Sequence, residues 1–230
     1  IGIDPMRAPS TSIDFHDWHR LIADHPADPA RVAAEADFQR NDLACIIYTS
    51  GTGGAPRGVM QHHGALLHNV NGCAALISED FGWDDEVFLS FLPLSHAYEH
   101  TGGQHFPIGL GGQIYYAEGL DKLAANIEEV RPTIMFVVPR LFEVLRTRIS
   151  KAIEKKGGMS AWLLDKALEI GAKQSAGRLS LIDRPTKLLV DTLFKPKIAK
   201  RFGGRMKAMV SGGAPLTPEV GLFFQSLGLT

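Results

Sequence analysis

Residues 48 to 59 read Tyr-Thr-Ser-Gly-Thr-Gly-Gly-Ala-Pro-Arg-Gly-Val, and this stretch decides the fold. It follows an apolar run that predicts a buried strand over residues 43–49, and it precedes apolar residues at helical spacing that predict a helix over residues 60–77. Its glycines let backbone N–H groups turn toward one point, its hydroxyls add donors, and Arg57 adds a positive charge. The sequence therefore predicts a polyphosphate-binding loop between a strand and a helix.

Two better-known phosphate loops do not fit this stretch. A P-loop needs lysine after its last glycine, and Val59 stands there. The dinucleotide fingerprint needs a third glycine where this chain has Pro56. An ordinary Gly/Pro turn after a strand is the remaining structural alternative, but the clustered hydroxyls and the basic residue favour phosphate binding.

The pattern Tyr-Thr-Ser-Gly-Thr-x-Gly-x-Pro-x-Gly resembles the phosphate loop of the AMP-forming acyl-CoA synthetases, which are relatives of luciferases and peptide-synthetase adenylation domains. The family usually has a second threonine where this chain has Gly53, and lysine where it has Arg57. Arginine keeps the charge but replaces a compact ammonium by a broad fork. The resemblance implies that ATP is bound, with its β- and γ-phosphates held by Thr49, Ser50, Gly51, Thr52, Gly53, Gly54 and Arg57.

A second block, Val-Ser-Gly-Gly-Ala-Pro-Leu over residues 210–216, supports the same family. The alternative is a glycine turn before a helix that begins near Pro218. In the family this block lies against the adenine, where small residues let a flat base approach the backbone. The resemblance therefore implies an adenine site made by Gly212, Gly213, Ala214 and Pro215.

A third block, Leu-Pro-Leu-Ser-His-Ala-Tyr-Glu-His over residues 92–100, follows a predicted strand. The resemblance implies that His96 is catalytic and orients the acyl carboxylate near the α-phosphate, and that Tyr98 and Glu99 lie near the entrance of the acyl pocket. A histidine hydrogen-bonded to backbone at a strand end is the structural alternative. The block also fits His-x-x-Glu-His, a zinc-peptidase motif that needs a helix. Pro93 upstream and Gly102-Gly103 downstream leave little room for that helix, and a zinc site would not account for either glycine block.

Composition agrees with an ordinary globular enzyme of 230 residues, 45% of them hydrophobic, with a formal net charge of −1. This charge argues against a nucleic-acid partner. We expect Cys45 and Cys73 to be buried in a reducing compartment. No apolar run approaches the ~20 residues of a spanning helix. We expect a cytoplasmic protein, and leave open peripheral contact with the inner face of a membrane and assembly into a homo-oligomer.

The order of elements predicts an α/β fold with a parallel, βαβ-connected sheet. Residues 1–40 are expected to be an irregular lead-in with one short helix near residues 15–23, and residues 41–230 part of an AMP-binding N-terminal domain. A helical insert is expected over residues 151–205 and resembles the long-chain fatty-acyl branch of the family. Further strands are expected at residues 86–92, 112–117, 133–138 and 206–210, and further helices at residues 120–130, 139–153, 161–175 and 185–202.

The resemblance implies ATP-dependent activation of a long-chain fatty acid to acyl-adenylate and then acyl-CoA, with Mg²⁺ as cofactor and CoA as co-substrate. It also implies that the chain is incomplete at both ends, that the C-terminal domain and the magnesium and lysine residues lie outside it, and that the fragment alone is inactive. An aryl- or short-chain acyl-CoA ligase of the same family and a non-catalytic nucleotide-binding fragment remain open alternatives.

Overall fold

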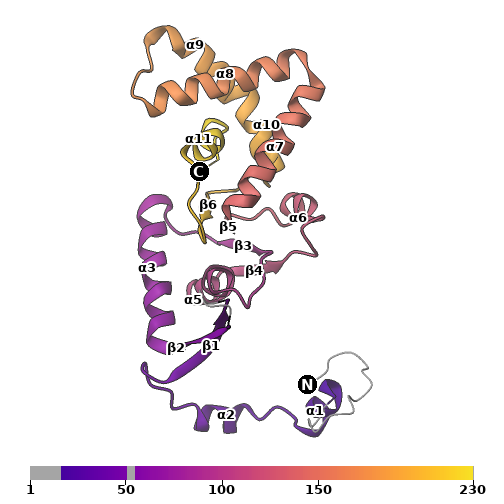
Figure 1. The fold of residues 1–230 in the computed structure, drawn as a ribbon, viewed down its shortest axis with the longest axis vertical. Helices are drawn as coiled ribbons and strands as arrows, with labels where there is room; N and C mark the ends of the chain where they lie inside the picture. Colours follow the sequence, from indigo (N-terminus) through magenta and orange to yellow (C-terminus); the bar gives the residue numbers. More distant parts are fainter. Residues whose placement is uncertain (1–16, 51–54, 230) are drawn as a thin grey trace. The chain divides into compact units, whose positions relative to one another are not determined.

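The computed structural model describes residues 17–50 and 55–229, and the chain divides into two units, Ile1–Asp42 and Leu43–Thr230 (Figure 1). The described part of the first unit holds α1 (Trp18–Asp24) and α2 (Pro29–Glu35), neither of which has a buried residue. The short helix predicted near residues 15–23 is confirmed as α1. The second helix was missed, although Asp28 caps it and Pro29 opens it in the usual way.

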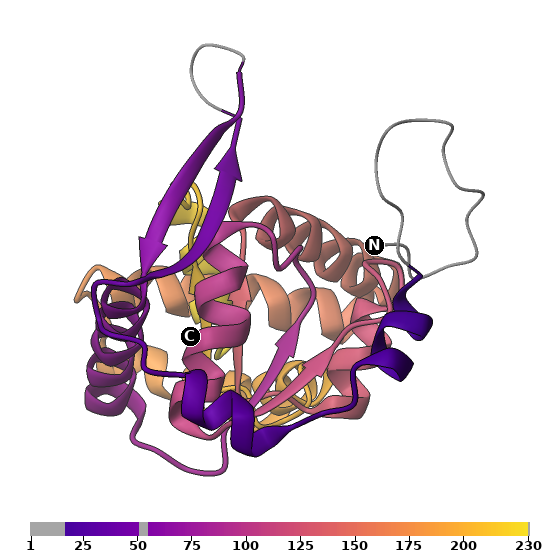
Figure 2. The ribbon, with the colours of Figure 1, turned by 90° about the horizontal axis from the view of Figure 1, so that it is seen from below.

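The second unit begins with an antiparallel hairpin, β1 (Leu43–Thr49) and β2 (Arg57–His62). Figure 2 shows it as a two-stranded ribbon that extends from the rest of this unit. The helix predicted from residue 60 begins later, as α3 (His63–Phe81), because residues 57–62 pair with β1. The prediction that β1 is buried was also wrong, since only Ile47 is buried in this strand.

The remaining strands form a parallel four-stranded sheet in the order β4-β3-β5-β6. Their bounds are β3 Val87–Ser90, β4 Gln113–Tyr116, β5 Ile134–Val137 and β6 Ala208–Ser211. Every residue of β3 and of β5 is buried, as is typical of central parallel strands that are covered on both faces. The predicted parallel sheet is therefore confirmed, with shorter strands than expected.

Helices cover both faces of this sheet. Ile134 and Phe136 of β5 belong to the core that they share with α3 and with α5 (Phe106–Leu110). Met135 and Val137 belong to the larger core on the other face. That core is built with α6 (Leu123–Val130), α7 (Pro139–Lys156), α8 (Gly158–Ser175), α10 (Lys195–Arg201) and α11 (Pro218–Ser226).

The insert between β5 and β6 is helical, as predicted. α7 ends at Gly157, whose positive φ of 60° suits glycine. The helix expected over residues 185–202 is divided into α9 (Arg184–Leu189), a π-helical turn over Val190–Phe194, and α10, with Pro196 in the first turn of α10. A short 3₁₀ turn, Leu181–Asp183, precedes α9.

Two further expectations concern exposure and membrane crossing. Cys45 and Cys73 are only half-buried, because Cys45 lies in the exposed hairpin and Cys73 on the flank of α3. Among residues 17–50 and 55–229, no helix has both the length and the apolar character that a membrane span requires.

Candidate functional site

Two of the three sequence blocks lie at the same edge of the parallel sheet. The loop that carries His96 leaves the carboxyl end of β3, and residues 212–215 leave the carboxyl end of β6. β5 lies between these two strands. This edge, where the chain leaves several parallel strands, is the usual location of ligand sites in open α/β sheets.

Tyr98 connects the two blocks. Its hydroxyl donates to the carbonyl oxygen of Val210 over 2.7 Å, although the two residues are 112 positions apart. Its ring packs edge-on against Phe136, with 5.7 Å between the ring centroids. Tyr98 also lies against Gly212, because a Cβ added at Gly212 would come within 2.2 Å of the ring. The Tyr98 side chain of the third block therefore packs against the second block.

The two glycines of the second block are required for different physical reasons. The close approach of a flat base was expected to account for both, but Gly212 is needed because Tyr98 occupies the space that a side chain there would fill. Gly213 has a positive φ of 80°, which itself favours glycine. Gly213, Ala214 and Pro215 are exposed, so they remain open to a ligand. The Ser211 hydroxyl beside them is buried and has no hydrogen-bond partner among the described residues.

Replacing Gly212 by alanine is expected to lower the free energy of unfolding by about 1–3 kcal/mol, because the added methyl overpacks against the Tyr98 ring. Chemical denaturation measures this change. Gly72→Ala is the matched control, since an added Cβ in that part of α3 meets no atom within 4 Å. The control is expected to stabilise the protein by about 0.5–1 kcal/mol, and equal effects of the two substitutions would contradict the contact.

His96 is exposed and begins the short helix α4 (Ala97–Glu99). Its ring Nδ1 accepts the backbone N–H of Tyr98 over 3.2 Å. A neutral ring with this acceptor carries its proton on Nε2, which makes Nε2 a donor. The arrangement is the backbone-bonded histidine that sequence analysis considered as the structural alternative, and it leaves a donor available to a ligand oxygen.

Glu99 is buried, with 1% of its surface exposed, and accepts a hydrogen bond from the Ser90 hydroxyl over 2.6 Å. This differs from the pocket entrance that the resemblance implied for it. Burial raises the pKa of the Glu99 carboxyl, and the Ser90 hydrogen bond opposes that rise only in part. Glu99 therefore anchors the segment that carries His96 to the end of β3.

The pH dependence of folding tests this buried carboxyl. Because the pKa of Glu99 is raised on folding, its contribution is present at low pH and is lost as the pH rises through the folded-state value. We expect Glu99→Gln to lack this loss, so that the difference in stability between the two proteins changes as the pH rises above about 4, where a free glutamate carboxyl ionises. Denaturation curves across that range measure it, and a constant difference would contradict the raised pKa.

The phosphate-loop block lies at the tip of the hairpin. Thr49 and Arg57 are opposite each other as the last pair of the ladder, and both they and Ser50 are exposed. The other loop residues of the prediction, Gly51, Thr52, Gly53 and Gly54, lie outside the described residues. The predicted connection between a strand and a helix was wrong, because the stretch joins two strands and Thr49 belongs to β1.

A contact at the base of the hairpin connects it to the segment after His96. The Cys45 sulfur lies 3.5 Å from Nε2 of His100 and 3.6 Å from the side-chain oxygen of Gln61. His100 begins the π-helical turn His100–His105, and its ring lies 4.3 Å from that of His105 between centroids. Burial and the neighbouring His105 lower the pKa of His100. The segment 96–105 therefore contacts the glycine block through Tyr98 and the base of the hairpin through His100.

The zinc alternative does not fit this geometry. In this motif the histidines hold the metal and the glutamate acts as base, but Glu99 is buried against Ser90 and the His100 Nε2 contacts the Cys45 sulfur. Within the described part of the chain, no cluster of three or more His, Cys, Asp or Glu residues is placed to hold a metal ion.

Comparison with known proteins identifies the family. The family described as AMP-binding enzyme matches residues 4–230. The chain belongs to this family. The resemblance that the three sequence blocks carried is therefore confirmed.

Long-chain acyl-CoA synthetases are among the curated relatives of this AMP-binding enzyme. Long chain acyl-CoA synthetase 6, peroxisomal, of Arabidopsis thaliana is 36% identical over 181 residues, which cover 78% of this chain and 24% of the relative. Long chain acyl-CoA synthetase 7, peroxisomal, of the same plant is 34% identical over 224 residues, which cover 94% of this chain and 29% of the relative. The chain thus spans less than a third of either relative.

Solved structures confirm the fold. The adenylation domain of a carboxylate reductase from Mycobacterium chelonae superposes with a TM-score of 0.58 at 23% identity, covering 84% of this chain and 26% of that one. The adenylation domain of a carboxylic acid reductase from Segniliparus rugosus gives a TM-score of 0.52 at 22% identity, covering 82% of this chain and 26% of that one. These likenesses establish the α/β fold of the AMP-binding enzyme and nothing finer.

Proposed function

We propose that the whole protein activates a long-chain fatty acid with ATP. In the first step a carboxylate oxygen attacks the α-phosphorus, the bond to the β-phosphate oxygen breaks, and pyrophosphate leaves. In the second step the CoA thiolate attacks the acyl carbonyl carbon, and AMP leaves with the electron pair of the broken bond. The observation that carries the proposal is the contact of Tyr98 with Val210 and Gly212, because it brings the His96 loop to the glycine block at one sheet edge.

Different residues of the candidate site would bind the adenine and the acyl carboxylate. The exposed backbone of residues 213–215 would accommodate the adenine. The Nε2–H of His96 would donate to the acyl carboxylate and to oxygens that gain charge during its attack.

The phosphates are assigned to the hairpin tip. Thr49, Ser50 and Arg57, together with residues 51–54, would hold the β- and γ-phosphates and lower the barrier by positioning and charge neutralisation. Mg²⁺, where bound, would supply further charge neutralisation to the phosphates and would need a shell of oxygen ligands. The described residues contribute no three-residue carboxylate or histidine cluster to that shell.

A pyrophosphate-release assay on the whole protein tests the proposal. The protein is supplied with ATP, Mg²⁺, CoA and single fatty acids of increasing chain length, and acyl-CoA is identified by mass spectrometry. We expect release to depend on the acid and to be highest with long chains. A preference for aryl or short-chain acids would indicate that the protein belongs to another branch of the family. Nucleotide binding without release for any acid would overturn the catalytic proposal.

The cytoplasmic location and the membrane and oligomer alternatives stay predictions. The two Arabidopsis thaliana relatives are named peroxisomal, and this name applies to those proteins. Fractionation of cells that express the whole protein measures the location directly.

A further inference from the structure

A large cavity lies at the edge of the sheet opposite to the one that carries the glycine block (residues 210–216) and the histidine block (residues 92–100). Its volume is about 860 Å³, and it is lined by the end of α6, by α10 and by the turn that leads toward β6. Arg131 in its wall comes shortly before β5, and Gly203 comes shortly before β6. The cavity therefore adjoins the amino ends of strands whose carboxyl ends carry the candidate nucleotide site.

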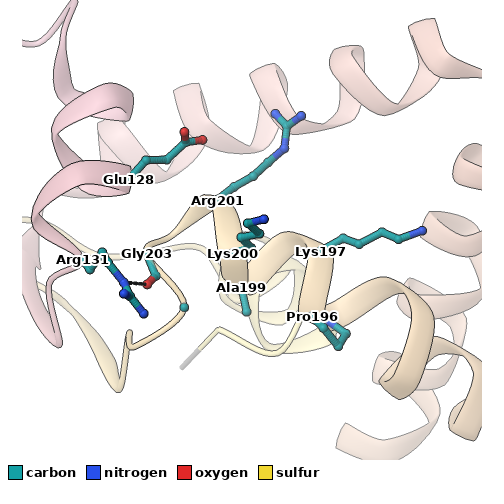
Figure 3. Close-up of a pocket in the computed structure, with 9 residues that line it drawn as sticks. Glu128, Arg131, Pro196, Lys197, Ala199, Lys200, Arg201 and Gly203 are labelled. Atoms are coloured by element: carbon teal, nitrogen blue, oxygen red, sulfur yellow. Dashed lines mark hydrogen bonds between the residues drawn. The ribbon is translucent and has the colours of Figure 1, made fainter.

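The wall of this cavity is basic. Four cationic residues line it, and Glu128 is the one acidic residue among its lining residues; the cations are Arg131, Lys197, Lys200 and Arg201. Figure 3 shows Lys197 and Arg201 leaving α10 in different directions, and Arg131 bonded to Gly203. That hydrogen bond runs from the Arg131 Nε to the Gly203 carbonyl oxygen over 2.9 Å.

These cations are not neutralised by neighbouring carboxylates. No ion pair formed within the described ranges, residues 17–50 and 55–229, includes Lys197, Lys200, Arg201 or Glu128. The whole chain has a formal net charge of −1, so the positive charge here is a local concentration. A concave surface with this imbalance attracts an anion.

An apolar crevice adjoins the basic wall. It has a volume of about 90 Å³ and lies between α7, α8 and α10. Its apolar lining consists mainly of buried or half-buried side chains, namely Ile149, Ile153, Leu163, Phe194, Ile198 and Phe202. Lys197 and Arg201 line both this crevice and the larger cavity, and Lys156 adds a third cation to the rim of the crevice.

We propose that the two cavities form one binding site for an anionic amphiphile. A phosphate or carboxylate head would lie at the basic wall that the two cavities share, and the adjoining methylene groups would enter the crevice. The crevice is smaller than the roughly 150 Å³ cavity that accepts a benzene ring, so it accommodates a short segment of a chain. A free amphiphile and a membrane lipid share this chemistry.

Calorimetric titration of the 230-residue chain with alkyl phosphates, each below its micelle concentration, tests both parts of the site. Affinity is expected to rise about fourfold for each of the first few methylene groups that enter the crevice, and then to level off. The double variant Lys197→Gln/Arg201→Gln is expected to bind dodecyl phosphate about thirtyfold more weakly.

The double variant Arg148→Gln/Lys151→Gln is the matched control. It also removes one arginine and one lysine charge, but from exposed positions of α7 that do not line either cavity. It is expected to bind dodecyl phosphate as the original chain does. Equal losses in both double variants, affinity independent of chain length, or no binding at all would overturn the proposal. Circular dichroism of each variant verifies that it folds.

Vesicles distinguish the two sources of the ligand. The chain is mixed with vesicles of phosphatidylcholine alone and of phosphatidylcholine with phosphatidylglycerol, and bound protein is measured by flotation. Binding to the anionic vesicles that is lost in Lys197→Gln/Arg201→Gln assigns the site to bilayer lipid. Binding of alkyl phosphate monomers without vesicle binding assigns it to a free amphiphile. Both results support the site.

Discussion

Replacing Arg57 by alanine in the whole protein is expected to lower ATP-dependent pyrophosphate release by about ten- to a hundredfold. Arg57 is exposed at the hairpin tip, opposite Thr49 in the ladder. If it neutralises phosphate charge, its loss removes one charge-assisted contact, which is worth roughly 1.5–3 kcal/mol. The dependence of the rate on ATP concentration should therefore change far more than its dependence on fatty-acid concentration.

Two variants control this measurement. Arg57→Lys is expected to be nearly silent, because it keeps the positive charge at the same ladder position. Arg148→Ala removes an exposed arginine from α7, away from the hairpin, and is expected to leave the rate unchanged. An ATP dependence that Arg57→Ala does not alter would show that Arg57 is an ordinary solvated charge.

Replacing Tyr98 by alanine is expected to lower the free energy of unfolding by about 3 kcal/mol, because it removes a large side chain that packs against Phe136 and Gly212. Tyr98→Phe keeps the ring and loses only the hydrogen bond to the Val210 carbonyl, so it should cost about 1 kcal/mol. Chemical denaturation of the 230-residue chain measures both values.

The same pair of variants tests how the two blocks depend on each other. In the whole protein, Tyr98→Phe should retain most of the activity, and Tyr98→Ala should lose it at a temperature where the variant is still folded. Tyr116→Ala is the control, since Tyr116 is 58% exposed on β4, and it should change stability by less than about 1 kcal/mol. Equal stability of Tyr98→Ala and Tyr116→Ala would contradict the packing of Tyr98.

Much of the fold could be predicted from the sequence, because its signals are local. Strand β5 has proline on either side, at Pro132 and Pro139, and α7 begins at Pro139 and ends at Gly157. Proline restricts the backbone, and glycine permits a positive φ, whatever surrounds them. The phosphate-loop block could be recognised for a related reason, since glycines and hydroxyls at fixed spacing are typical of loops that bind phosphate groups.

The hairpin shows where local signals were insufficient. The apolar series Leu66, Val70, Ala74 and Ile77 does lie in a helix, but the predicted start at residue 60 was too early, because residues 57–62 form β2 and pair with β1. Strand pairing is a property of two segments, and neither segment alone reveals it.

The candidate site divides in the same way. The sequence by itself determined which residues are candidates for nucleotide binding, because His96, Arg57 and the block 210–216 match the motifs of the family. Only the tertiary structure decided that Tyr98 lies under Gly212 and that the charges of α10 border an apolar crevice. The physical reason is that contacts between residues so distant in the chain form only when the sheet brings their strands and helices together.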